Sequence, residues 1–171
     1  MKLELVKVPN PLLKQKSKTI TVVDDEIKKL IDDMIETMYE DKGIGLSAIQ
    51  VGKLLRLVVI DIRDKGEEKK NPQIFINPVI TKFSDEKEYM EEGCLSVPGQ
   101  RAEVLRSLEV EVKYNDINMK EHTIKADGLL AHCLQHEIDH TNGIVYLDYL
   151  SKLKKDVLIK KSQKFDKMYN E

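Results

Sequence analysis

QHEIDH, residues 135–140, is the stretch of this 171-residue chain around which a fold can be predicted. On an α-helix, His136 and His140 project from one face because they are four residues apart, and Glu137 lies beside them. Two imidazoles at this spacing can hold one metal ion, and the adjoining carboxylate can act as a general base or acid. The HExxH pattern therefore predicts a metal site, and it requires a surrounding helix and a third ligand elsewhere.

The residues that flank the motif predict that helix. Asp127 is a candidate N-cap, and Asn142 followed by Gly143 is a typical stop, so the helix should run to about residue 141. A second helix is predicted at about 25–41 from apolar residues at helical spacing, with Asp24 as its N-cap and Gly43 ending it in a left-handed conformation. The motif thus lies on a helix, with another helix well before it.

Strands are predicted in the middle of the chain. LLRLVVIDI (54–62) and PQIFINPVI (72–80) have the composition of buried strands, separated by an exposed turn at DKGEEKKN (64–71). After a second turn at SDEKEY and a short strand, AEVLRSLEVEVKY (102–114) is predicted as a strand that returns through HTIKA as an antiparallel hairpin. The glycine-rich GIGLSAIQVG (43–52) predicts a loop that turns tightly or approaches another segment closely.

A third, amphipathic helix is predicted at about 151–168, with Leu153, Val157, Phe165 and Met168 forming its apolar stripe. Strands in the middle with helices before and after them predict an α+β fold, with antiparallel or mixed sheets around the helix that contains the motif. The length predicts one domain spanning residues 1–171.

Charge and apolar runs exclude several classes of protein. The first residues lack an apolar run of signal-peptide length, and LLRLVVI, interrupted by Arg56, is too short to span a membrane, so we expect a cytoplasmic protein without membrane contact. The two cysteines are too far apart to form a CxxC pair, which favours a reducing compartment. The net charge of −2 disfavours a general nucleic-acid binder, but residues 152–171 contain seven Lys and three acidic residues. The basic charge is concentrated at the C-terminal end.

The third ligand of the predicted metal site is sought outside the motif, because catalytic sites usually have three protein ligands. The longer pattern HExxHxxGxxH fails because Tyr146 stands where its last His should be, and the first downstream Glu is Glu171. Cys94, in a loop bounded by glycine and proline, remains, and a thiolate suits zinc or ferrous iron. His132 is four residues before His136, but three histidines over eight residues span about 12 Å of helix, too far to converge on one ion.

A metal held by these ligands would lower the pKa of bound water from 15.7 towards about 7. Glu137 would then transfer that water's proton to a leaving amine. Gln50 and the backbone N–H of Leu95 are candidate donors to the tetrahedral intermediate, each worth about 10²- to 10³-fold in rate. From the residues alone, an ordinary loop amide is an equally good interpretation of Gln50. Asp139 is expected to orient a ligating His or to cap a neighbouring segment.

Three blocks in order, GIGLSAIQ, EGCLS and QHEIDH, together resemble the three signature motifs of peptide deformylases, and the likeness covers nearly the whole chain. The resemblance implies removal of the formyl group from the formyl-methionine of nascent polypeptides, with release of formate. It implies Fe²⁺ as the metal, with Zn²⁺, Ni²⁺ or Co²⁺ as substitutes. It implies the following roles: metal ligands Cys94, His136 and His140; acid/base Glu137; oxyanion donors Gln50 and the Leu95 N–H.

The same resemblance implies a pocket for the methionine side chain and a peptide-binding backbone. The residues implied around the pocket are Ile44, Met90, Leu95, Leu129, His132 and Cys133, with the backbones of Gly45 and Gly93 near the peptide. Arg101 is implied to fix the peptide or the active-site loop. Two positions depart from the family pattern: Ser47 stands where Ala is common, and His132 replaces an aliphatic residue and would polarise the pocket.

The lysine-rich tail resembles that of deformylases with a long C-terminal helix, which docks on the ribosome; a solvated helix packed on the domain is the alternative. We expect a monomer. Two other functions remain open: a zinc endopeptidase, and a non-catalytic protein with a structural metal and a ribosome-binding tail. Glu137 and Gln50 speak against the latter, because a structural metal site needs neither.

Overall fold

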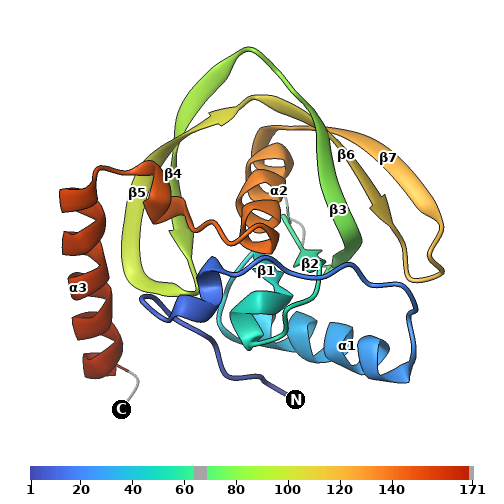
Figure 1. Cartoon of the computed structure of the whole chain (residues 1–171), viewed down its shortest axis with the longest axis horizontal. Helices are drawn as coiled ribbons and strands as arrows, with labels where there is room; N and C mark the ends of the chain where they lie inside the picture. Colours follow the sequence, from blue (N-terminus) through green and yellow to red (C-terminus); the bar gives the residue numbers. More distant parts are fainter. Residues whose placement is uncertain (64–68, 170–171) are drawn as a thin grey trace.

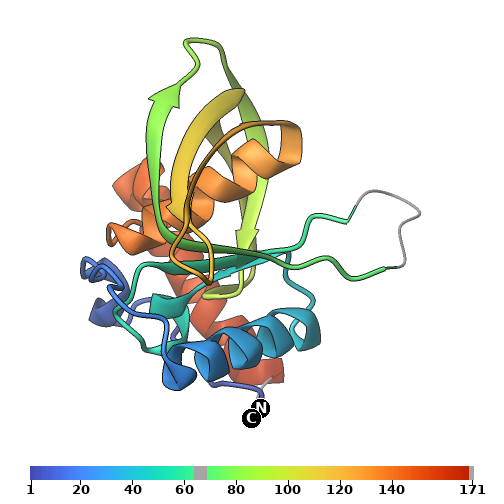
Figure 2. The same cartoon turned by 90° about the vertical axis from the view of Figure 1, so that its right-hand side faces the viewer.

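A computed structural model describes residues 1–63 and 69–169 and shows a helix enclosed by two sheets (Figures 1 and 2). The regular elements, in chain order, are η1 (Pro11–Lys14), α1 (Asp25–Glu40), β1 (Gly45–Ser47), η2 (Ala48–Val51), β2 (Leu57–Ile60), β3 (Gln73–Phe83), β4 (Lys87–Cys94), β5 (Val97–Ser107), β6 (Glu109–Asn115), β7 (Glu121–Asp127), α2 (Gly128–Thr141), η3 (Tyr146–Tyr149) and α3 (Lys152–Tyr169).

The strands form one five-stranded sheet, in the order β1-β2-β3-β6-β7, and one two-stranded sheet of β4 and β5. All the strand pairs are antiparallel. The motif helix α2 lies between the two sheets and contacts strands of both (Figure 1). The predicted α+β fold, with a helix at each end of the chain and the motif helix in the centre, is confirmed.

The first helix begins where the sequence predicts and ends differently. Asp24 caps it by accepting a hydrogen bond from the N–H of Ile27 (2.9 Å). At the other end Lys42, not Gly43, takes the left-handed conformation (φ 58°), and the N–H of Gly43 then reaches the carbonyl of Met38 (2.8 Å) in a Schellman motif. Gly43 is needed for space instead, because a Cβ there would lie 2.8 Å from the Leu95 side chain.

The glycine-rich segment 43–52 is not the predicted loop. It forms β1 and the 3-10 helix η2, and β1 is an edge strand paired with β2. A three-residue strand is too short to produce a recognisable alternation of side chains, so its pairing could not be predicted. The strand predicted at 54–62 is shorter, at Leu57–Ile60. Of the turn predicted at 64–71, residues 64–68 lie outside the described residues.

The predicted strand 102–114 is divided between the two sheets. It is interrupted at Leu108, so that β5 ends at Ser107 in the two-stranded sheet and β6 begins at Glu109 in the five-stranded sheet. Ser84 fixes the crossing, because its N–H and Oγ bond the carbonyl and N–H of Glu109 (2.9 and 3.0 Å). The hairpin of β6 and β7 is confirmed.

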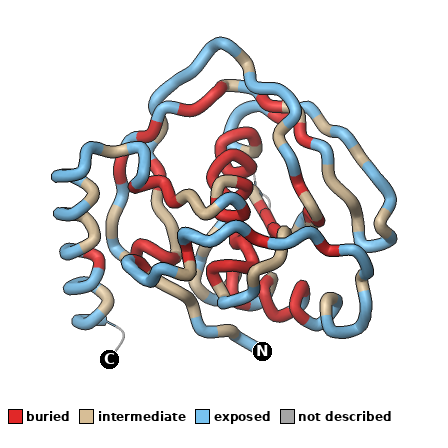
Figure 3. The backbone as a smooth tube through the Cα atoms, viewed as in Figure 1, coloured by how far each residue is buried: buried red, intermediate tan, exposed pale blue. Residues whose placement is uncertain are grey.

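The motif helix α2 is buried almost throughout, as its red colour in Figure 3 shows. Every residue from 131 to 138 is buried, and polar side chains therefore lie inside the protein beside apolar ones. Asp127 occupies the N-cap position without a capping side-chain hydrogen bond, and Gly143 (φ 77°) follows the C-cap Asn142. Buried polar groups need partners, so α2 is where a functional site is expected.

The C-terminal helix α3 packs on β5 with a face that includes only part of the predicted stripe (Figure 1). Leu153 and Met168 are 77% and 66% exposed, whereas Ser162 is 1% exposed and donates to the carbonyl of Pro98 (3.1 Å). Phe165, a member of the predicted stripe, does contact β5, because a Cβ at Gly99 would lie 2.4 Å from its ring. Leu158 and Ile159 pack against the core cluster that includes Val97. None of the described helices is long and apolar enough to cross a membrane.

Candidate active site

Three side chains with metal-binding atoms converge where β4 ends against α2. The ligand atoms of Cys94, His136 and His140 all lie within 4.8 Å of one another, and Cys94 Sγ is 3.4 Å from His140 Nε2. His140 is completely buried and His136 is 9% exposed. The structure thus brings together the HExxH histidines and the cysteine that the sequence proposes as their partner.

The surroundings of these three residues fit a divalent metal ion. His136 Nδ1 lies 2.8 Å from a carboxylate oxygen of Glu92, which leaves its Nε2 for a metal. The Nδ1 of His140 and the Oε1 of Glu137 are buried without a hydrogen-bond partner among the described residues. One thiolate and two imidazoles are a donor set for zinc, ferrous iron or similar ions.

The carboxylate next to His136 is Glu92, whereas Asp139, which was expected to orient a ligating His or to cap a neighbouring segment, accepts from Arg106. Arg106 donates to both oxygens of Glu92 (2.7 and 2.9 Å) and to Asp139 (2.7 Å). Burial by itself would raise the pKa of Glu92, but Arg106, His132 and His136 hold that pKa well below its usual range. Glu92 was missed, although it precedes Cys94 by two residues and a strand places such residues on one face.

Glu137 lies in the buried site beside the ligands. Its carboxylate is 3% exposed, with Oε1 3.9 Å from His140 Nε2. Burial raises the pKa of Glu137 to about 7, the range that suits proton transfer near neutral pH. Gly45 on β1 leaves it room, because a Cβ there would lie 2.8 Å from Glu137 Oε2. The close approach predicted for the glycine-rich segment therefore takes place at Gly45.

Gln50, on η2, has its side-chain amide fixed against the cysteine. Its Oε1 accepts from the N–H of Ser47 (2.9 Å), and its Nε2 lies 3.0 Å from Ser96 Oγ and 3.4 Å from Cys94 Sγ. The residue is 1% exposed. The amide is thus a preorganised donor next to the metal-binding atoms, and Ser96 is a partner that the sequence analysis missed.

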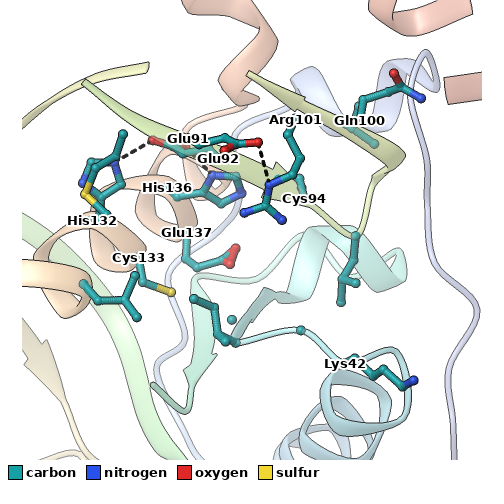
Figure 4. A pocket seen from close by; sticks show the side chains of 18 of the residues that line it. Lys42, Glu91, Glu92, Cys94, Gln100, Arg101, His132, Cys133, His136 and Glu137 are labelled. Atoms are coloured by element: carbon teal, nitrogen blue, oxygen red, sulfur yellow. Dashed lines mark hydrogen bonds and ion pairs between the residues drawn. The ribbon is translucent and has the colours of Figure 1, made fainter. Parts of the chain in front are cut away.

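A cavity of about 500 Å³ opens beside this cluster (Figure 4). All the residues implied for the pocket and the peptide line this cavity. Cys94, His136, Glu137 and Gln50 line it as well. The lining also includes residues that were not predicted from the sequence: Lys42, Gly43, Glu91, Glu92, Val97, Gly99 and Gln100. Most of these lie on or beside β4 and β5, whose pairing places them next to one another.

His132 and Cys133 are two of the five α2 residues that line the cavity. His132 is 5% exposed and its Nε2 is 3.1 Å from Glu92 Oε2, so it lies beside the metal-binding cluster but is not a member of it. Cys133 is 7% exposed, and burial raises the pKa of its thiol well above the ordinary value. The thiol therefore behaves as a small apolar group, as predicted.

Arg101 lies at the cavity rim. Its Nε is 3.2 Å from Glu91 Oε1, and the two side chains are 64% and 63% exposed (Figure 4). An ion pair this exposed contributes little to stability. Arg101 is therefore available to contact a ligand that enters the cavity.

Comparison with known proteins places this site in a family. The family described as polypeptide deformylase matches residues 2–156. The peptide deformylase of Agrobacterium fabrum is 52% identical over 160 residues, covering 94% of each chain; that of Pelagibacter ubique is 54% identical over 156 residues, covering 91% of this chain and 90% of that protein. The crystal structure of peptide deformylase from Ehrlichia chaffeensis superposes with a TM-score of 0.93 at 43% identity, covering 98% of both chains.

Proposed function

The chain belongs to the peptide deformylase family, and from this premise we propose which of its residues perform each part of the reaction. The protein is a metal-dependent hydrolase that removes the N-formyl group from nascent polypeptides. The observation that supports the assignment of roles is the convergence of Cys94, His136 and His140 beside Glu137.

Cys94, His136 and His140 are proposed as the ligands of one divalent ion. When bound, such an ion supplies Lewis-acid chemistry, which polarises a carbonyl and activates water. Glu92 fixes the tautomer of His136 by accepting from its Nδ1. We propose Fe²⁺ as the native ion, as the resemblance to the family implies. Zn²⁺, Ni²⁺ or Co²⁺ are proposed as substitutes, because thiolate and imidazole ligands suit all four ions.

Glu137 is proposed to move the proton. It takes a proton from the water whose oxygen adds to the formyl carbon, and it delivers a proton to the amine nitrogen as the C–N bond breaks. The products are formate and a free N-terminal amine. The buried position of Glu137 beside the two histidines supports this role, because its carboxylate lies next to the atoms that would hold the ion.

Gln50 and the backbone N–H of Leu95 are proposed to stabilise the oxyanion that forms on the formyl oxygen. The Gln50 amide is held in place by Ser47 and Ser96, and its second N–H, which faces Cys94 Sγ at 3.4 Å, is the proposed donor to the oxyanion. Leu95 follows Cys94 directly, which brings its N–H next to the same atoms. Both lie on the lining of the cavity.

The methionine side chain of the substrate is proposed to enter the cavity between α2 and β4. Ile44, Met90, Leu129 and Cys133 supply apolar surface that suits a thioether, and His132 adds a polar edge. The backbones of Gly45 and Gly93 are proposed to bind the peptide, with Arg101 near its downstream residues. An endopeptidase would instead cleave internal bonds of unformylated peptides.

The deciding experiment measures formate release from formyl-Met-Ala-Ser by protein purified without oxygen. Glu137→Gln should lower kcat at least about 100-fold, since general acid–base catalysis contributes about 10²- to 10⁴-fold. The matched control is Glu121→Gln, which should leave activity unchanged. Glu121 is exposed and pairs with Lys113 on the five-stranded sheet. Activity undiminished by Glu137→Gln, or cleavage of internal bonds without formate release, would overturn the proposal.

The metal proposal has its own measurement. Elemental analysis of protein purified without oxygen should find about one iron per chain. Activity should decay in air, because oxygen oxidises the ferrous ion or the Cys94 thiolate. Zinc-loaded protein should lose activity more slowly, because its ion cannot be oxidised. An iron-loaded sample that is fully stable in air would contradict the assignment.

We propose that α3 binds the ribosome through its lysines. Its seven lysines are exposed except for Lys155, which pairs with Asp148, and ribosomal RNA offers a dense array of phosphates. The variant Lys160→Glu/Lys161→Glu should weaken co-sedimentation with ribosomes and reduce its salt dependence. The control Lys82→Glu, on β3, should not. Equal binding by the two variants would exclude α3 as the contact.

We further propose that residues 1–171 form one monomeric, cytoplasmic domain. The packing of α3 on β5 and the two free cysteines support this. Light scattering after gel filtration should give the 19.7 kDa mass of one chain. A mass of twice that value would overturn the monomer proposal.

A further inference from the structure

A continuous series of contacts connects the metal-binding cluster to a tyrosine on the surface. His136 Nδ1 is 2.8 Å from Glu92, and Arg106 donates to both oxygens of Glu92. Arg106 also donates to Asp139 Oδ2 (2.7 Å), and the hydroxyl of Tyr149 donates to that same oxygen (2.7 Å). Tyr149 is not among the residues that line the cavity. We propose that Tyr149 is a positioning residue of the metal site, acting on His136 through this series.

Tyr149 has two contacts with the buried charges, and they act in the same direction. Its hydroxyl bonds Asp139, while its ring stands over the guanidinium of Arg106, with 4.8 Å between the guanidinium carbon and the ring centroid. Arg106 and Glu92 are 4% and 5% exposed, Asp139 is 17% exposed, and Tyr149 is 51% exposed. Tyr149 is therefore the outermost group of the series and separates the Arg106–Asp139 pair from water.

Shielding the pair keeps Arg106 in the orientation that Glu92 needs. Ion pairs and charged hydrogen bonds are stronger where water is excluded. Burial and the bond to Asp139 raise the pKa of Tyr149 to about 12, so the hydroxyl keeps its proton and remains a donor at neutral pH. Without Tyr149, water competes for the hydrogen bonds of Asp139 and Arg106. The two hydrogen bonds from Arg106 to Glu92 then become weaker.

The place of Tyr149 in the chain strengthens the inference. It ends η3, the short helix between the motif helix α2 and the C-terminal helix α3. The first residue of η3, Tyr146, is buried, and its ring centroid is 6.0 Å from that of His136. The two ends of η3 thus contact the metal-binding helix, one at the imidazole itself and the other at the charges that hold it.

The inference rests on the proposed metal site, and its test measures metal affinity as well as activity. The dissociation constant of Zn²⁺ is measured by competition with a chromophoric chelator, and urea unfolding is measured on the metal-free protein. Direct partners of metal ligands typically contribute about 10- to 100-fold in affinity. Because Tyr149 acts through three residues, Tyr149→Phe should weaken zinc binding about 3-fold, and Tyr149→Ala about 10-fold.

The control is Tyr169→Phe, another exposed tyrosine, on α3, whose ring contacts Phe165. The zinc affinity of this variant should equal that of the unaltered protein. KM for formyl-Met-Ala-Ser should stay unchanged in Tyr149→Phe, because the residue is absent from the cavity lining. Zinc binding by both Tyr149 variants as tight as in the unaltered protein would overturn the inference. So would a loss of metal-free stability with unchanged zinc affinity, which would mean a purely structural role.

A double-mutant cycle tests the route through the carboxylate. In a Glu92→Gln background, Tyr149→Phe should no longer affect zinc affinity, because the group that transmits its effect is gone. A loss of the same size in both backgrounds would refute the route. Cys94→Ser separates this inference from the proposed function: if the unaltered protein binds zinc no better than Cys94→Ser, the metal site itself is wrong, whereas normal binding with unaffected Tyr149 variants rejects only the role of Tyr149.

Discussion

Replacing Arg106 with methionine should reveal how strongly this protein depends on a buried ion pair. The guanidinium is 4% exposed and makes three hydrogen bonds, two to Glu92 and one to Asp139. Methionine keeps most of the apolar stem and removes the charge. Glu92, 5% exposed, then keeps its negative charge in a buried site with only the two neighbouring histidines near it.

Arg106→Met should lower the free energy of unfolding by about 3–5 kcal/mol, because removing one partner of a buried pair leaves an uncompensated charge. This is a large part of the roughly 5–15 kcal/mol that stabilises a typical domain. The matched control is Lys113→Met. Lys113 pairs with Glu121 at 3.1 Å, but the two side chains are 52% and 60% exposed. Lys113→Met should lower the free energy of unfolding by only about 0–1 kcal/mol.

The assay is urea unfolding of the metal-free proteins, followed by circular dichroism. The double variant Arg106→Met/Glu92→Leu should recover much of the lost stability, because the fully buried charge of Glu92 is gone and Asp139, 17% exposed, keeps its hydrogen bond from Tyr149. It should still bind zinc weakly, because His136 has lost its orienting carboxylate. The reasoning is refuted if Arg106→Met costs no more than Lys113→Met, or if the double variant is as unstable as the sum of its two single changes.

Two further predictions concern stability. Gly143→Ala should destabilise the protein by at least about 2 kcal/mol more than Gly52→Ala in urea unfolding. Both glycines have positive φ (77° and 84°), but a Cβ at Gly143 would lie 2.3 Å from the backbone oxygen of Lys14, whereas a Cβ at Gly52 would meet open space. Equal losses of unfolding free energy in the two variants would contradict this prediction. His122, 2.7 Å from Asp116, lowers the pKa of that carboxyl. The stabilisation is present above the unfolded pKa and lost as pH falls, so Asp116→Asn should lower Tm more at about pH 6 than at about pH 3, and a pH-independent difference would rule this out.

Local patterns were sufficient wherever the chemistry depends on neighbours in the chain. Helical periodicity places His136 and His140 on one face, whatever the rest of the protein does. The spacing of apolar residues and the capping residue Asp24 predicted where α1 begins. Because the longer protease patterns fail, Cys94 is the remaining candidate for the third ligand, and its Sγ lies 3.4 Å from His140 Nε2 in the structure.

The surroundings of the ligands could not be predicted in this way. The choice of Glu92, and not Asp139, as the partner of His136 depends on how β4 lies against α2. Arg106 reaches both carboxylates because β5 pairs with β4, and such long-range polar contacts leave no periodic signal in a sequence.

The sequence by itself determined that His136 and His140 share one face of a helix with Glu137 beside them, and where α1 begins, because each follows from spacing along a single element. The tertiary structure alone decided which face of α3 packs on the domain and which charges hold His136. Ser162 at the backbone of Pro98 and Phe165 at Gly99 lie on the side of α3 that meets β5, whereas Leu153 is exposed. Such outcomes depend on the shape and charge of surfaces that meet only when the chain is folded.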